Sequence, residues 1–426
     1  MSERGRGALL RGRVLTPVDP TRAVAFEDGF VAIDPDGRIA GVGAWQAFAP
    51  PAGPSSAFDP RAAIDTGRAL ILPAFVDAHV HLPQLPVRAR YGDPLLAWLA
   101  RHVYPAEAAF ADADHAAREA ARFFGALAAA GTATAAVFAT VHPEATHRAF
   151  EAAAASGLRI VMGNVLMDRE APAELLEPGI GGVRATLDLA ERWEGAAGGR
   201  LHVAVTPRFA PACSDELLAA AGEAARGAGL RVQTHLAESA DEIEAVRRLF
   251  PESSDYLAVY EHAGLAGERS IFAHSIHLGA SEFRRIAGSG AAVACCPTSN
   301  AFLGSGSFPL AAAREAGVEI GLGSDVGAGP QLSLLDAARH LSYLDRPAPA
   351  EILYRATLGG ARALDLTGTT GRLAPGLAGD ILVLEPPPDA TGDPLELFVQ
   401  CVFRQPETRV VALLVDGVVV HGSLEP

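Results

Sequence analysis

The sequence predicts an α/β fold, in which a (β/α)8 TIM-like barrel is accompanied by a small β-domain built from both chain ends. From residue 69 to residue 371, apolar strand-like segments alternate with helical segments rich in Ala, Leu, Arg and Glu. This pattern is typical of parallel strands joined by crossover helices. The flanking parts, 1–68 and 372–426, have β-type patterns. A chain of 426 residues is long enough for a barrel and one small accessory domain.

The expected elements follow a simple order along the chain. Residues 7–68 are predicted to form short strands and turns, with turn residues at 34–37. Beyond residue 372, the segments 380–384 and 409–420 are expected to pair with the N-terminal strands in one sheet. Eight apolar segments are the expected barrel strands: 70–78, 132–140, 159–166, 200–207, 231–236, 270–275, 291–296 and 318–324.

Metal-binding residue types occur where several of these strands end. His79 and His81 are separated by one residue, and side chains at positions i and i+2 of a strand share a face. Two further strands end at His235 and His274, and the last ends at Asp325. A single histidine at a strand end is more often a satisfied polar contact. Five such residues at the carboxyl face of a barrel predict a catalytic metal centre.

Imidazole and carboxylate ligands without a thiolate suit Zn²⁺, one per chain, or Fe²⁺, with one position open for water. We expect His79, His81, His235 and Asp325 to be the ligands. A metal ion there would lower the pKa of a bound water toward neutrality. Asp325 would also accept a proton from that water, and His274 would hydrogen-bond the hydroxide or the developing oxyanion.

Glu238 is the expected general acid and base. It follows His235 by three residues, where the chain turns toward the next helix, so its carboxylate can reach a substrate beside the metal. The alternative is that Glu238 belongs to the acidic first turn of that helix, where it would interact favourably with the helix dipole.

The composition excludes several kinds of site and partner. All 35 basic residues are arginines, which excludes a Schiff-base lysine, a phosphate-loop lysine and a carboxylated lysine bridging two metals. The formal charge of −15 argues against a nucleic acid or an anionic membrane as partner. No charge-free apolar run reaches a membrane-spanning length, and the four cysteines form no C-x-x-C pair. We therefore expect a cytoplasmic protein.

Several motifs carry a family resemblance, and they occur in the family's order. They are 79–84, 94–99 with 104–107, 138–142, 206–209, 234–238, 296–300 and 323–326. With these motifs the chain resembles the amidohydrolase superfamily in its single-metal deaminase branch, and within that branch it is most similar to the guanine deaminase family. The resemblance implies hydrolytic deamination of guanine to xanthine and ammonia by a metal-activated water, with a purine base as the small-molecule partner.

The resemblance also implies which residues bind the base. Gln84 and Arg208 would hydrogen-bond the purine edge, with Arg208 at the 6-oxo group and Phe209 as an aromatic wall. Arginine only donates hydrogen bonds, so it favours a carbonyl over an exocyclic amine. The alternatives are a surface or inter-strand ion pair for Arg208 and a loop-capping amide for Gln84.

Three other functions stay open from the sequence. A deaminase of a related 2-amino-4-oxo heterocycle, such as a pterin or 8-oxoguanine, would keep the metal site and differ in pocket size. A cyclic-amide hydrolase commonly needs the lysine that this chain lacks, and a metal-free scaffold protein would not need a complete ligand set. We expect a homodimer, in which Trp98 and Tyr104 line either the subunit interface or the mouth of the substrate site.

Overall fold

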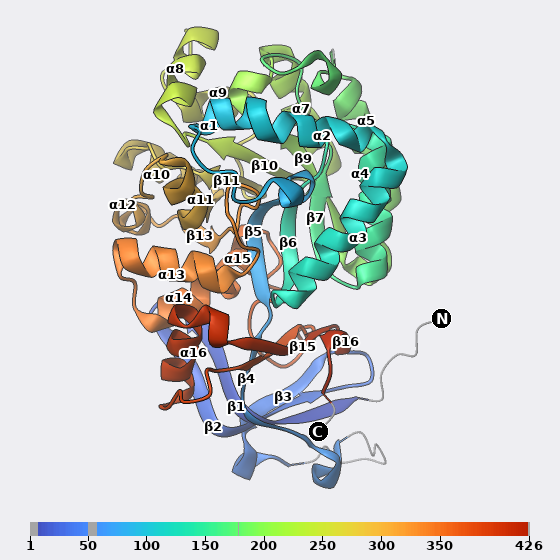
Figure 1. Cartoon of the computed structure of the whole chain (residues 1–426), viewed down its shortest axis with the longest axis vertical. Coiled ribbons are helices and arrows are strands. Elements are labelled where there is room, and N and C mark those ends of the chain that lie inside the picture. The colour runs from blue at the N-terminus through green and yellow to red at the C-terminus, as the bar shows by residue number, and fades with distance from the viewer. Residues whose placement is uncertain (1–6, 50–57, 178, 425–426) are drawn as a thin grey trace.

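The computed structural model describes residues 7–49, 58–177 and 179–424, and its strands form two separate sheets (Figure 1). In the larger sheet, eight parallel strands form the wall of a nearly closed barrel, which confirms the predicted fold class. A further two-residue strand, β8 (Val165–Leu166), pairs with the end of β9. In spatial order the barrel strands are β5 (Phe75–His81), β6 (Thr132–Phe138), β7 (Arg159–Gly163), β9 (Leu201–Pro207), β10 (Arg231–Leu236), β11 (Ser270–His274), β12 (Ala292–Cys295) and β13 (Glu319–Leu322).

The barrel closes between its first and last strands, through residues that follow β13. The Asp325 N–H donates to the carbonyl of His79 at 2.9 Å, and the His81 N–H donates to the carbonyl of Val326 at 3.0 Å. Because the strands are parallel, their carboxyl ends meet at one face of the barrel. This closure brings the last predicted site residue beside the first two.

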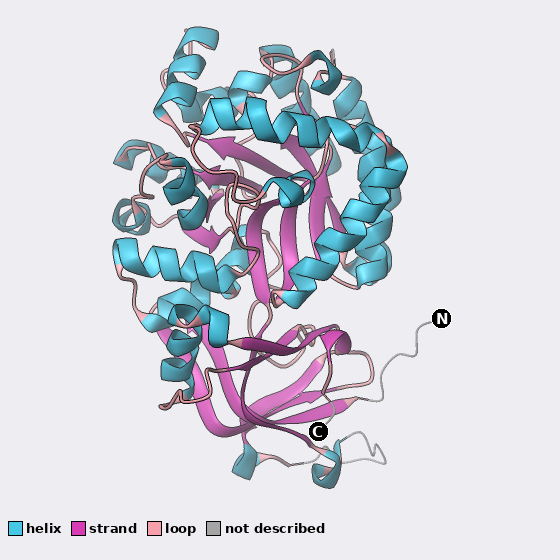
Figure 2. Cartoon of the chain, in the orientation of Figure 1, coloured by secondary structure: helices cyan, strands magenta, loops and turns pink. Residues whose placement is uncertain are grey.

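Helices surround the barrel strands (Figure 2). Their inward faces are apolar; α3, for example, buries Phe123, Phe124 and Leu127 completely. Burial of such a face contributes more to helix stability than intrinsic propensity does. The helices are α3 (Ala113–Ala129), α4 (Pro143–Ser156), α5 (Gly181–Trp193), α7 (Asp215–Ala228), α8 (Ala240–Leu249), α9 (Tyr256–His262), α10 (Ala280–Ser289), α11 (Pro297–Leu303), α12 (Leu310–Glu315), α13 (Leu334–Asp345), α14 (Pro349–Ala356) and α15 (Leu358–Ala363).

A long segment that connects β5 to β6 lies across the barrel (Figure 1). This segment later supplies one wall of the candidate site. It consists of the 3-10 helix η4 (Leu82–Val87), α1 (Leu95–Trp98), the π-helical turn η5 (Leu99–Val103), α2 (Tyr104–Ala108) and the 3-10 helix η6 (Ala109–Ala111).

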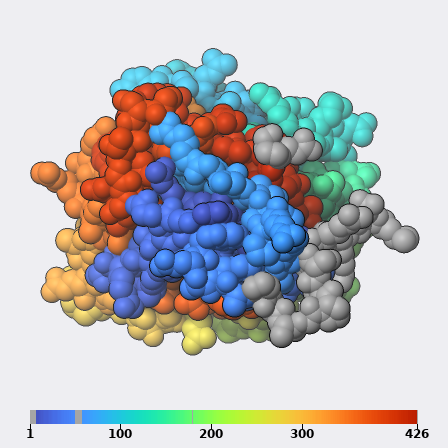
Figure 3. Space-filling view, turned by 90° about the horizontal axis from the view of Figure 1, so that it is seen from below, coloured from blue at the N-terminus to red at the C-terminus, as the bar shows by residue number. Residues whose placement is uncertain are grey.

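The smaller sheet contains strands from both ends of the chain, as predicted. Its spatial order is β16 (Val418–Gly422), β15 (Arg409–Val415), β14 (Ile381–Glu385), β4 (Ile64–Pro73), β1 (Ala8–Asp19), β2 (Arg22–Ile33) and β3 (Ile39–Ala44). The helix α16 (Pro394–Phe403) packs beside it. Viewed from below, the N-terminal and C-terminal parts of the chain lie side by side (Figure 3). The domain boundaries at residues 68 and 372 stay a prediction.

The predicted strand 70–78 is wrong, because the structure divides this segment between the two sheets. Residues up to Pro73 belong to β4, which pairs with β14 and β1, and the barrel strand β5 starts at Phe75. At the junction, the Ala74 N–H donates to the carbonyl of Asp380. Side chains on both sides of this junction are buried, so an apolar run gives no sign of the change of sheet.

The N-terminal strands also differ from the expectation of short strands. β1 and β2 have 12 residues each and pair as one antiparallel hairpin. Charged side chains on their exposed face, such as Arg11 and Asp28, form an ion pair at 2.8 Å and interrupt the apolar pattern. No helix among the described residues is long and apolar enough to cross a membrane. All four cysteines are buried and form no disulfide.

Candidate active site

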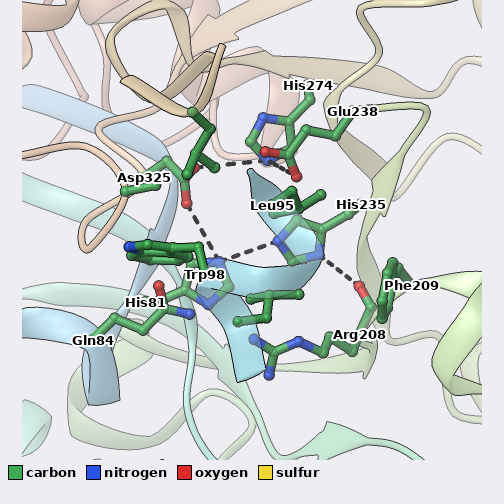
Figure 4. Close-up of a pocket in the computed structure, with 13 residues that line it drawn as sticks. His81, Gln84, Leu95, Trp98, Arg208, Phe209, His235, Glu238, His274 and Asp325 are labelled. Atoms are coloured by element: carbon green, nitrogen blue, oxygen red, sulfur yellow. Dashed lines mark hydrogen bonds and ion pairs between the residues drawn. The ribbon is translucent and has the colours of Figure 1, made fainter. Parts of the chain in front are cut away.

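The five predicted metal-site residues form one buried cluster at the carboxyl face of the barrel. Figure 4 shows four of them, His81, His235, His274 and Asp325. The His81 Nε2 atom lies 3.2 Å from the His79 Nε2 atom and 3.1 Å from the His235 Nε2 atom. Asp325 Oδ1 lies 3.2 Å from the Nε2 of His79 and 3.4 Å from the Nε2 of His81. His274 is close to the same carboxylate, with 3.7 Å between its Nε2 and Asp325 Oδ2.

A β-bulge in β5 turns the first two histidines toward this cluster. Val76 and Ala78 pack inside the barrel with small side chains of the other strands. Between Asp77 and Val80 the pairing with β6 shifts by one residue. Such a bulge reverses which side chains of a strand face inward. His79 and His81 therefore point into the barrel, although Ala78, the residue just before them, also does. The sequence pattern predicted that the two histidines share a face, but not this bulge.

Asp77 joins the bulged strand to the segment that carries Asp325. Its carboxylate accepts hydrogen bonds from the N–H of His79 at 3.2 Å and from the N–H of Ser324 at 3.0 Å. The Ser324 hydroxyl donates to the second oxygen at 2.5 Å. Burial raises the pKa of Asp77 to about 6, although these hydrogen bonds lower it. Asp77 therefore holds the first and last ligand segments together, a role that the sequence did not reveal.

The protonation states of the histidines fit a cation. The His235 Nδ1 atom lies 2.5 Å from the carbonyl oxygen of Arg208. A carbonyl only accepts, so Nδ1 carries the proton and Nε2 keeps its lone pair. Burial lowers the pKa values of His79, His81 and His235, which keeps these imidazoles neutral.

The spacing of the donor atoms fits a metal ion as well. Tetrahedral coordination with bonds of about 2.0–2.1 Å places neighbouring ligand atoms about 3.3 Å apart. Four of the separations among the donor atoms of His79, His81, His235 and Asp325 are 3.1 to 3.4 Å. Neutral imidazole nitrogens and a carboxylate oxygen suit a divalent ion such as Zn²⁺ or Fe²⁺.

His274 and Glu238 lie beside the cluster with unused polar atoms. The His274 Nδ1–H donates to Asn300 Oδ1 at 2.9 Å, which leaves the Nε2 lone pair facing Glu238 Oε2 at 3.5 Å. Among the described residues, His274 Nε2 and Glu238 Oε1 are buried and have no hydrogen-bond partner. Buried polar atoms of this kind commonly take a partner from a ligand or water.

Glu238 and Asp325 have opposite pKa shifts. Burial, together with the negative charges of Asp325 and Glu242, raises the pKa of Glu238 well above its ordinary value. Burial also acts to raise the pKa of Asp325, but its hydrogen bond with His79 and its other interactions with the neighbouring imidazoles outweigh burial and lower it. The pKa values of two carboxyl groups in one pocket are thereby shifted apart, which favours a protonated Glu238 and an ionised Asp325.

The alternative helix-turn role of Glu238 is wrong. Helix α8 begins after its N-cap Ser239, and the acidic residues of its first turn are Asp241 and Glu242. Glu238 precedes the cap, and its side chain lines the pocket. Its backbone N–H donates to Glu242 Oε2 at 2.8 Å. The capping interaction therefore fixes the backbone of Glu238 and leaves its carboxyl group free.

The cluster forms one side of a pocket of about 380 Å³. The predicted base-binding residues Gln84, Arg208 and Phe209 also line it, and further walls are apolar (Figure 4). The remaining lining residues are Leu95, Trp98, Leu99, Leu303 and Ala328. A mostly apolar pocket with a few converging polar groups is typical of a small-molecule site.

Both base-binding residues make contacts that the sequence did not predict. Arg208 is neither on the surface nor in an inter-strand pair, because its Nη1 is 2.5 Å from Oε2 of the buried Glu107. For Gln84, only the amide oxygen contacts the backbone of a loop, and the amide nitrogen contacts a side chain. Its Nε2 donates to Glu107 Oε1 at 3.3 Å, and its Oε1 accepts from the Gly327 N–H at 3.2 Å.

Trp98 and Tyr104 are both buried but have different surroundings. Trp98 is 2% exposed and lines the pocket. Tyr104 is 7% exposed and lies under Arg208, whose guanidinium carbon is 5.3 Å from the ring centroid. Glu107 and Asn300 lie within motifs of the sequence, but their roles depend on partners far along the chain and no local signal marks them.

With this geometry established, comparison with known proteins identifies the family. The Amidohydrolase family model matches residues 70–422. This chain belongs to the amidohydrolase family. The family implies a divalent metal, in agreement with the cluster described above.

Individual relatives agree with this assignment. The guanine deaminase of Escherichia coli K12 is 38% identical over 387 residues, which cover 89% of this chain and 85% of that protein. The E. coli guanine deaminase structure matches with a TM-score of 0.89 at 32% identity, covering 98% of this chain and 99% of that one. The C. acetobutylicum guanine deaminase structure, which has guanine bound in the active site, matches with a TM-score of 0.88 at 27% identity and covers 97% and 100% of the two chains.

The first prediction concerns the metal ligands. Replacement of His79, His81, His235 or Asp325 by Ala should reduce bound metal well below one ion per chain, because each change removes a donor atom from the cluster. The measurement is elemental analysis of the purified variants, with circular dichroism to check the fold. His202→Ala is the control, because His202 pairs with Glu194 away from the pocket. Unchanged metal content in the four cluster variants would contradict the assignment.

Proposed function

We propose that this protein catalyses the hydrolytic deamination of guanine, with xanthine and ammonia as products. The observation that carries the proposal is the position of a donor-only Arg208 and the Gln84 amide in the same pocket as the His/Asp cluster. The relatives named guanine deaminase support it, since one of them holds guanine in its active site. Adenine would present an amine where Arg208 requires an acceptor.

The overall change replaces the 2-amino group of the base by oxygen from water. A divalent ion held by the cluster would act as a Lewis acid and would lower the pKa of water toward neutrality. We propose Zn²⁺, one per chain, because imidazole and carboxylate donors at this spacing suit it, with Fe²⁺ as the alternative. His79, His81, His235 and Asp325 would hold the ion.

Glu238 performs the proton transfers in this proposal. Its raised pKa favours the protonated form of the carboxyl group, so it can donate a proton to the ring nitrogen next to C2 while water oxygen bonds to C2. The resulting carboxylate takes up a proton from the attacking water and passes it to the amino nitrogen. The C2–N bond then breaks and ammonia leaves, while the proton of the new C2 hydroxyl returns to the Glu238 carboxylate. This restores Glu238 and balances guanine plus water against xanthine plus ammonia.

His274 and Asp325 orient the attacking water. Because its Nδ1–H is used by Asn300, His274 presents a lone pair at Nε2, which accepts a hydrogen bond from the water. The ionised Asp325 is a second acceptor on the same side. Both residues lie across the pocket from Arg208 (Figure 4), so in this proposal the base is held at one edge and attacked at the other.

Location and assembly are also proposed. The acidic composition and the reduced, unpaired cysteines support a cytoplasmic protein. A homodimer remains our expectation, although Trp98 and Tyr104 no longer support it, because both are buried within the chain.

The second prediction tests the substrate class directly. Ammonia release should be measured from guanine, 8-oxoguanine, isoxanthopterin, adenine and cytosine at equal concentrations. Guanine should have the highest kcat/KM, and adenine and cytosine should release no ammonia above background, because neither offers Arg208 an acceptor at the 6-position of a purine. A higher kcat/KM for isoxanthopterin than for guanine would replace the proposal with a pterin deaminase.

The third prediction concerns Glu238. Glu238→Gln should lower kcat by about 10²–10⁴-fold, because general acid–base catalysis contributes a factor of this size. Metal content should not change. The control is Glu244→Gln on α8, whose side chain is exposed and pairs only weakly with Arg247 at 3.5 Å. A variant with normal kcat and a raised KM would show that Glu238 binds the base without transferring protons.

A further inference from the structure

Glu107 is a buried carboxylate between the two polar residues that face the base. It lies on α2 and is 2% exposed. One oxygen, Oε2, accepts from Arg208 Nη1 at 2.5 Å, and the other, Oε1, accepts from Gln84 Nε2 at 3.3 Å. Glu107 does not line the pocket itself, so any effect on the base must act through these two neighbours.

The first effect of Glu107 is on charge. Arg208 is buried, and an unpaired buried guanidinium would be strongly unfavourable. Burial acts to lower the pKa of Arg208, but the charge of Glu107 outweighs it and raises the pKa above its ordinary value. The ion pair as a whole carries no net charge. The base-binding side of the pocket is therefore polar and electrically balanced, which suits an uncharged heterocycle.

The second effect is on the orientation of Gln84. Its amide nitrogen faces the Glu107 carboxylate, and its amide oxygen accepts from the Gly327 N–H. A flipped amide would place its oxygen against the carboxylate and its nitrogen against an N–H donor, so both contacts would be repulsive. Gln84 therefore presents one fixed N–H and one fixed lone pair, and Arg208 is held in the same arrangement.

We propose that Glu107 is a positioning and specificity-determining residue, which fixes Gln84 and Arg208 and makes the pocket selective for an uncharged base over an anionic one. This inference rests on the proposed deamination of guanine. It extends that proposal by assigning the charge state of the accepted ligand and the residue that sets it.

Glu107→Gln is the main test, because it keeps the size of the side chain and removes the charge. The KM for guanine should rise about tenfold, the size expected when a charge-assisted hydrogen bond is weakened. The kcat should stay within about threefold, because Glu238 and His274 do not contact Glu107. Urate, an anion at neutral pH that has no amino group to lose, should inhibit the variant at a lower concentration than it inhibits the wild type.

Glu107→Asp separates charge from geometry. This change keeps the carboxylate charge but shortens the side chain by one methylene group. Inhibition by urate should therefore return to the weak wild-type level, while the KM for guanine stays raised. Glu351→Gln is the matched control, because Glu351 is a buried glutamate paired with Arg355 at 2.8 Å on α14, away from the pocket. This control should leave both KM and urate inhibition unchanged.

The outcomes distinguish this inference from the proposed function. Absence of ammonia release by the wild type would refute guanine deamination, whatever the variants do. If the wild type is active and Glu107→Gln weakens the binding of guanine and of urate equally, Glu107 has a merely structural role and the inference is overturned. A loss confined to kcat would overturn it too. If Glu107→Gln fails to fold, Glu107→Asp alone decides, since an unchanged KM for guanine in that variant contradicts a positioning role.

Discussion

The structure depends on one electrostatic constraint at the end of the barrel. Among three buried imidazoles and a carboxylate, four pairs of donor atoms lie 3.1 to 3.4 Å apart. Neutral nitrogens and an anionic oxygen at this spacing call for a cation. The fold builds the arrangement from three strand ends, a bulge in β5 and the closure between His79 and Asp325. Asp77 and the carbonyl of Arg208 then fix the orientation of the ligand groups.

The same pocket separates two kinds of carboxyl group by their surroundings. Asp325 lies among imidazoles, which favour its ionised form, whereas Glu238 is buried beside other acids, which favours its protonated form. On the opposite wall, Glu107 balances the charge of Arg208. Asp325, Glu238 and Glu107 thus differ in charge and in pairing. The neighbouring groups determine the state of each residue.

The sequence predicted the barrel, the mixed origin of the small sheet and the residues of the cluster, because these depend on short-range patterns. Strand ends in a parallel barrel meet, so local spacing around His235 or Asp325 implies a shared site. Three features have no local signal. The bulge in β5 depends on pairing with β6, the change of sheet at Pro73 lies within a continuous buried run, and Glu107 pairs with a residue 101 positions away.

A metal titration tests the central claim most directly. Metal-free protein would be titrated with Zn²⁺ while ammonia release from guanine is followed. The cluster described here predicts no turnover without metal and a linear rise in activity that ends at one equivalent per chain. Full turnover by the metal-free protein, or a rise that continues to two equivalents, would contradict a single catalytic ion held by His79, His81, His235 and Asp325.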